Sequence, residues 1–95
     1  MKKDILERLE IEVKACKRYA ENSIIKSREG NIGSAISLLN IAGTAKKCAE
    51  QLHEELWKES QGNLNEEEFE LFCESETLGR EIKKAYKELN IARQK

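Results

Sequence analysis

Proline is absent from the 95-residue sequence, and histidine, tryptophan and methionine occur once each. The turn signals are therefore the glycine-containing stretches REGNIGS, at residues 28–34, and SQGNLN, at residues 60–65. Between them the apolar residues recur with helical spacing, and no segment shows the alternation with period two that marks a half-buried β-strand. The sequence thus predicts an all-α fold of three successive helices.

No apolar run approaches the ~20 residues that a membrane-spanning helix needs. The N-terminal sequence MKKDILERLEIE turns acidic where a signal peptide would carry its apolar segment, so we expect a soluble cytoplasmic protein. An excess of positive charge is also missing, because 17 basic residues stand against 18 acidic ones and the formal net charge is −1. Proteins that bind nucleic acid or acidic membranes usually have a basic excess. We therefore expect neither as a partner.

Cysteine pairs with metal-binding spacing are missing as well. Cys16, Cys48 and Cys73 lie far apart, and the chain has no C-x-x-C or C-x-x-H motif. A zinc site built from such pairs is excluded. Three separated cysteines predict reduced thiols that pack as small apolar side chains, mostly buried.

The expected helices cover residues 4–29, 32–60 and 65–93 of a single domain that spans residues 1–95. The pairs Asp4–Glu7 and Asn65–Glu68 predict capping boxes at the starts of the first and third helices. Short turns make successive helices antiparallel neighbours, which gives an up-down-up three-helix bundle. The middle helix carries the clearest heptad stripe, formed by Ala35, Leu38, Ala42, Ala45, Ala49, Leu52 and Leu56.

Small residues in the second and third helices indicate close helix packing. Alanine in the stripe allows a neighbouring helix to approach more closely than leucine would. Gly43 and Gly79 lie inside the expected helices, where glycine costs about 1 kcal/mol relative to alanine, and we attribute them to a close crossing within or between chains. Because three slim helices bury only a thin core, coiled-coil-like completion by a second copy, as a homodimer, is one expectation.

The only histidine lies in the stretch CAEQLHEEL, where Glu50 and His53 form a Glu-x-x-His unit. Carboxylate-bridged iron and manganese sites in bundles use two such units and two further carboxylates, all facing inward. One histidine per chain means that a complete site needs two chains. The other interpretation is a helix surface at the edge of the stripe, with Glu50 paired to Lys46. A metal-binding dimer that uses Glu50, His53 and Glu12 with iron or manganese is therefore an alternative, and not the preferred reading.

The stretch EVKACKRY, which begins at Glu12, and the later pair Glu29–Gly30 resemble rubrerythrin-type members of the ferritin-like superfamily. In that family a ligand glutamate precedes A-x-x-R-Y and a Glu-Gly pair follows. The resemblance covers residues 12–56 and implies a similar helical hairpin. It does not imply an oxidase, because the family's next Glu-x-x-His would fall on Ala45 and Cys48. The same hairpin is also similar to those of tetratricopeptide-type repeats, which favours an interaction role.

No nucleophile–base pair can be assembled around the single histidine. We therefore expect a small, non-enzymatic interaction or adaptor protein that binds a protein partner. Aromatic side chains dominate protein–protein contacts, so the first candidates for the partner-binding surface are Trp57, Phe69, Phe72 and Tyr86.

Overall fold

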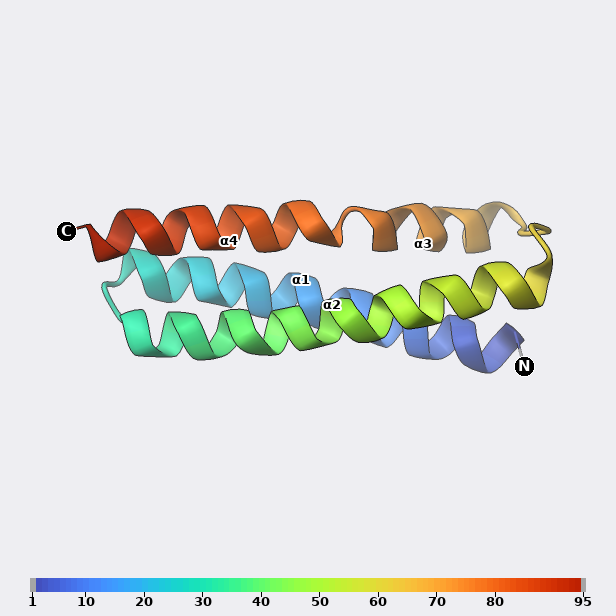
Figure 1. Cartoon of the computed structure of the whole chain (residues 1–95), viewed down its shortest axis with the longest axis horizontal. Coiled ribbons are helices and arrows are strands. Elements are labelled where there is room, and N and C mark those ends of the chain that lie inside the picture. The colour runs from blue at the N-terminus through green and yellow to red at the C-terminus, as the bar shows by residue number, and fades with distance from the viewer. Residues whose placement is uncertain (1, 95) are drawn as a thin grey trace.

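A computed structural model describes residues 2–94 of the chain. It confirms the all-α class: four helical segments, α1 (Lys2–Arg28), α2 (Ile32–Ser60), α3 (Glu66–Glu76) and α4 (Leu78–Arg93), form an up-down-up bundle. In Figure 1, α3 and α4 follow each other along one side of the bundle, above α1 and α2. The molecule measures 49 × 17 × 16 Å, so its length is that of one long helix. None of the helices described is long and apolar enough to cross a membrane.

The turn between α1 and α2 is fixed by one glycine and two polar side chains. Gly30 has φ +80°, a left-handed conformation that glycine adopts without steric cost. Asn31 caps α2, because its side chain accepts a hydrogen bond from the Ser34 amide at 3.3 Å. Inside the hairpin, the buried hydroxyl of Ser23 donates to the Ala35 carbonyl at 2.7 Å. These contacts set the register in which α1 and α2 pack.

The buried stripe of α2 differs from the predicted one at a single position. Ala35, Ala42, Ala45, Ala49, Leu52 and Leu56 are buried as expected. Leu39 is also buried, with 3% of its surface exposed, whereas Leu38 is only partly buried. The heptad reading chose Leu38 because a strict 3.5-residue repeat places it in the stripe. A straight helix has 3.6 residues per turn, so the buried line drifts and passes through Leu39 at this end.

The predicted single helix over residues 65–93 is broken at Thr77, so the expected range is corrected to two segments. The Thr77 amide and hydroxyl both donate to the Glu74 carbonyl, at 3.0 and 2.7 Å. Side-chain hydroxyls that bond the preceding turn compete with the helical hydrogen bonds and bend helices. The apolar spacing continues through the break without interruption, so the spacing alone could not reveal the break. The two segments together are called the α3–α4 helix below.

The two predicted capping boxes had different outcomes. Asn65 and Glu68 make the reciprocal box, with both bonds at 2.9 Å. The backbone hydrogen bond from Asn65 is the main reason why the pKa of Glu68 is lowered. The box at Asp4 is not formed, because α1 already begins at Lys2 and Asp4 lies within its first turn. An acidic residue there still interacts favourably with the helix dipole.

The crossing expected at Gly43 and Gly79 is not formed within the chain, and the expectation that the cysteines are mostly buried is wrong. A Cβ on Gly43 would meet nothing within 4 Å, and a Cβ on Gly79 would meet only the Lys46 side chain, at 3.8 Å. Neither glycine therefore marks a close backbone crossing within the chain. Of the free cysteines, Cys16 is buried and Cys48 is exposed, while Cys73 is partly buried. Burial raises the pKa of the Cys16 thiol.

Candidate functional site

A cluster of four rings lies where the C-terminal half of α2 meets α3. The imidazole of His53 stacks on Phe72, with ring centroids 3.7 Å apart and planes inclined by 17°. Trp57 approaches the same ring at 5.3 Å, and Phe69 lies 6.3 Å from it along α3. Phe72 is thus the centre of the cluster and the point at which α3 is attached to α2.

A hydrogen bond joins the two helices beside these rings. His53 Nδ1 lies 2.5 Å from the hydroxyl of Ser75, which is buried near the end of α3. The same hydroxyl donates to the Phe72 carbonyl at 2.7 Å. A serine has one hydroxyl proton, so with that proton committed to Phe72, it is His53 Nδ1 that carries the proton of the shared bond. Neutral His53 then leaves Nε2 unprotonated, 3.6 Å from the carboxylate of Glu76.

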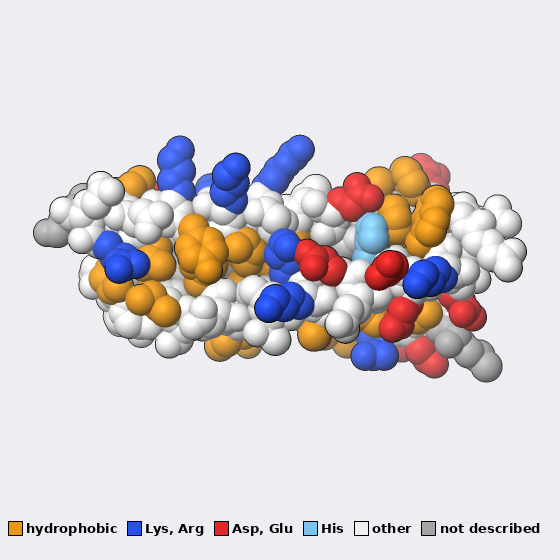
Figure 2. All heavy atoms as spheres, in the orientation of Figure 1, with side chains coloured by type: hydrophobic (Ala, Val, Ile, Leu, Met, Phe, Trp, Pro, Cys, Tyr) orange, Lys and Arg blue, Asp and Glu red, His pale blue; other side chains and the backbone are white. Residues whose placement is uncertain are grey.

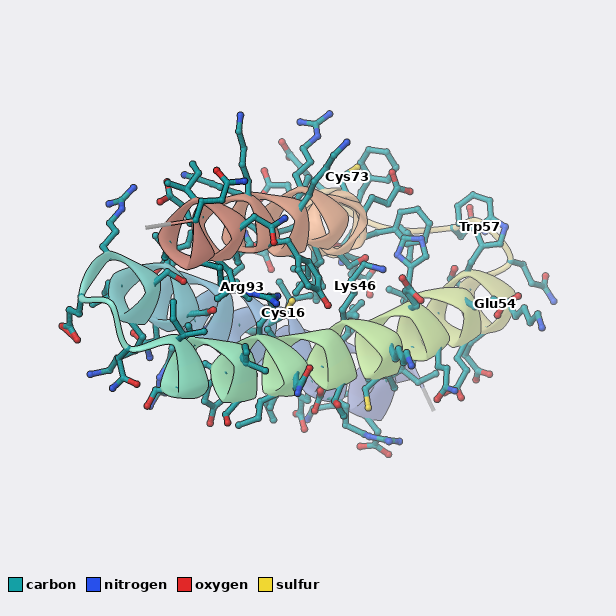
Figure 3. All side chains as sticks on the ribbon, turned by 60° about the vertical axis from the view of Figure 1, so that its left-hand side comes forward. Cys16, Lys46, Glu54, Trp57, Cys73 and Arg93 are labelled. Carbon is teal, nitrogen blue, oxygen red and sulfur yellow. The ribbon has the colours of Figure 1, made fainter. Side chains whose placement is uncertain are left out.

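This arrangement clamps the helices together and does not activate a nucleophile. A catalytic serine gives its proton to the histidine and stands open to substrate. Here the Ser75 hydroxyl is buried and donates to its own helix, while the imidazole face is covered by Phe72. A hollow of about 310 Å³ beside the clamp is lined by Lys46, Glu50, His53, Ser75, Glu76 and Gly79. Figure 3 shows Lys46 extending from α2 toward the α3–α4 helix.

Burial lowers the pKa of His53, and the nearby Glu76 carboxylate opposes this shift only in part. The pKa in the folded state is therefore below that in the unfolded chain, about 6.5. The unfolded chain binds more protons as the pH falls through this range, so the free energy of unfolding falls too. The other charged groups that line the hollow are Lys46 and Glu50.

We expect urea unfolding of the wild type to show a loss of stability between about pH 7.5 and 5.5. The variant His53→Phe keeps a ring for stacking on Phe72 but cannot titrate, so its stability should change less over the same interval. Carboxylates contribute to the pH dependence of stability only at lower pH, because their unperturbed pKa values are near 4. If the free energy of unfolding changed equally with pH in the two proteins, His53 would not be the source of the pH dependence.

The predicted metal ligands are not brought together by this fold. Glu50 and His53 line the hollow next to α3, with Glu50 paired to Lys46 as the surface interpretation predicts. Glu12 lies in a separate hollow between α1 and α2, beside Cys48. Across residues 2–94, no three His, Cys, Asp or Glu side chains are placed to share a metal ion. A metal site would need ligands from a second chain.

The predicted partner-binding residues separate into one group and one isolated ring. Trp57, Phe69 and Phe72 come together, and we call these three residues the aromatic surface. Trp57 and Phe69 expose 49% and 52% of their surface. Trp57 also lies over the turn at Gly62, whose Cβ position is 3.5 Å from the indole ring. Tyr86 is equally exposed but lies on α4, apart from the cluster.

Ser75 and Glu76 were not predicted as part of this site. Ser75 is a buried residue of α3, and a polar residue at such a position normally has a hydrogen-bond partner. That rule points to a bond but does not name His53, because the partner comes from a helix 22 residues away in sequence. Sequence spacing alone gives no rotation of one helix relative to another.

No family model, no curated protein and no solved structure matches this chain. The resemblance of residues 12–56 to rubrerythrin-type and tetratricopeptide-type hairpins therefore stays a prediction.

Proposed function

We propose that this chain is a non-enzymatic protein-interaction module whose binding surface is the aromatic surface. One observation carries the proposal. Trp57 and Phe69 each leave about half of their surface exposed, while both pack on a common, partly buried ring, Phe72. Contiguous apolar patches larger than a few hundred Å² are uncommon on monomeric proteins, and aromatic residues are enriched among those that contribute most binding energy at interfaces.

The surroundings of these rings favour binding because they hold the surface rigid. Phe72 is stacked on His53, and the next turn of α3 is tied to the same imidazole through Ser75. A surface that is already ordered loses less conformational entropy when a partner binds. The clamp described above therefore has a role in such a module: it fixes α3 against α2 and so fixes the position of the three rings.

Affinity capture with variants tests this proposal. We expect Trp57→Ser and Phe69→Ser to lose a protein partner that the wild type retains, since both remove exposed apolar contact. Ile11, which is 62% exposed on α1, provides the matched control: Ile11→Ser removes a similarly exposed apolar side chain outside the surface and should retain the partner. Circular dichroism checks that all variants are folded. Identical sets of captured proteins for all four baits would contradict the proposal.

A further inference from the structure

One flank of the α3–α4 helix carries residues at regular seven-residue spacing that the bundle covers only in part: Phe72 is partly buried, whereas Gly79 and Tyr86 are exposed. Seven residues make about two turns, so Phe72, Gly79 and Tyr86 lie on one side of the helix. This flank borders α2 at the surface of the bundle, because Phe72 stacks on His53 and Gly79 lies beside Lys46. In Figure 2, apolar side chains gather toward both ends of this face, and charged side chains lie between them.

The α3–α4 helix is also strongly divided in charge. Segment α3 has six glutamates among its 11 residues and no basic residue. Segment α4 has five basic residues, Arg80, Lys83, Lys84, Lys87 and Arg93, and two acidic ones. Within residues 2–94, none of these five basic side chains makes an ion pair. The bundle therefore leaves the basic charges of α4 without an ion-pair partner among the described residues, whereas Glu88 is paired with Arg28.

We propose that this face binds a second copy of the chain, with the two α3–α4 helices antiparallel about a twofold axis at Gly79. The inference rests on the proposed function, since the pairing face includes Phe72, the ring on which Trp57 and Phe69 of the aromatic surface pack. The axis places Phe72 of one copy opposite Tyr86 of the second copy. It also places Glu76, three residues before Gly79, near Lys83 of the second copy, four residues after it. The pairing face therefore consists of Phe72, Glu76, Gly79, Lys83 and Tyr86.

Charge complementarity favours a second copy of the chain as the partner and an antiparallel orientation of the two helices. An antiparallel pair sets the acidic α3 of each copy against the basic α4 of the other, whereas a parallel pair would set the six glutamates of α3 against each other. A twofold axis satisfies both contacts at once, because the same patch serves on both copies. The two apolar ends of the face then meet each other, and Phe72 of one copy covers the half-exposed Tyr86 of the second copy.

Glycine at the axis fits this arrangement. Two helices normally pack with their axes 8–10 Å apart, and the residues at the closest point set that distance. A side chain at Gly79 would meet only Lys46 within its own chain, so packing inside the monomer does not require glycine there. Gly43, one turn before Lys46 on α2, is equally unconstrained by its own chain. A crossing between chains at the axis accounts for Gly79.

A charge exchange tests the proposed pairing with the full chain. Glu76→Lys puts two lysines together at each contact between the copies, and Lys83→Glu puts two glutamates together. We expect sedimentation velocity to show a dimer for the wild type and at least about tenfold weaker association for each variant. The double variant Glu76→Lys/Lys83→Glu restores opposite charges and should dimerise again.

Mixing the two single variants tests the register directly. One variant then offers lysine at both positions and the other offers glutamate at both, so only the mixed dimer has attractive contacts. Native mass spectrometry should show a dimer with one copy of each. The control pair Arg18→Glu and Glu21→Lys makes the same exchange at exposed sites on α1 and should dimerise like the wild type. Circular dichroism confirms that each variant is folded.

Two results would overturn the inference: a wild-type chain that stays monomeric at all accessible concentrations, or a dimer that forms equally well in both single variants. Loss of the captured partner in Trp57→Ser with a monomeric wild type would show that the aromatic surface binds another protein. In that case the proposed function stands and the self-pairing fails. A dimer that obeys the charge exchange, while Trp57→Ser and Phe69→Ser capture the same proteins as the wild type, would support the self-pairing and contradict the proposed function.

Discussion

Replacing Leu39 with alanine is expected to lower the free energy of unfolding by about 2–5 kcal/mol. Leu39 is 97% buried in the stripe that α2 presents to the core, so the substitution removes buried methyl groups and leaves a cavity. A domain of this size is stable by only about 5–15 kcal/mol, so the loss is a large fraction of the total. Urea unfolding, followed by circular dichroism at one fixed protein concentration, measures it.

Leu38→Ala is the matched control, because it removes the same side chain from the neighbouring position. Leu38 is only partly buried, so we expect a clearly smaller loss of stability. The fixed protein concentration matters because self-association would make the apparent stability depend on it. If both variants lost equal stability, or Leu38→Ala lost more, Leu38 would belong to the buried stripe as the heptad repeat predicts. The burial pattern described for α2 would then be wrong.

These two leucines also show how far the sequence determines the fold. Helical spacing, two glycine turns and the Asn65–Glu68 box were enough to predict the all-α class, a bundle of three helical rods and their antiparallel order. They could not choose between Leu38 and Leu39, since both are equally apolar and lie next to each other. They also missed the break at Thr77, because a break made by side-chain hydroxyl bonds leaves the apolar spacing unchanged.

The candidate site was predictable only in part, for a similar reason. Trp57, Phe69 and Phe72 could be named as interaction residues from their type alone. Their grouping around Phe72, and the separation of Tyr86 from them, depend on how α3 is rotated against α2. The stack of His53 on Phe72 depends on the same rotation. The spacing of residues within one helix does not determine that rotation, because packing between the helices sets it.

Ala49→Leu is expected to cost about 1–3 kcal/mol of unfolding free energy, for the opposite reason to Leu39→Ala. Ala49 has no exposed surface and belongs to the alanine part of the α2 stripe. Helices α1 and α2 share the most extensive contact in the bundle, and small side chains let them pack closely. A leucine there has no space, so side chains leave their preferred rotamers or the helices separate.

Thermal unfolding should show the effect as a lower Tm, since 1 kcal/mol corresponds to about 4–8 °C for a domain of up to about 100 residues. Thr44→Leu, at an exposed position of the same helix, adds a similar side chain in solvent and should stay within about 0.5 kcal/mol of the wild type. If Ala49→Leu raised the Tm, the added side chain would be filling space beside α2. The alanine stripe would then be a loosely packed seam, and the close packing of α1 on α2 would no longer explain why alanine is found there.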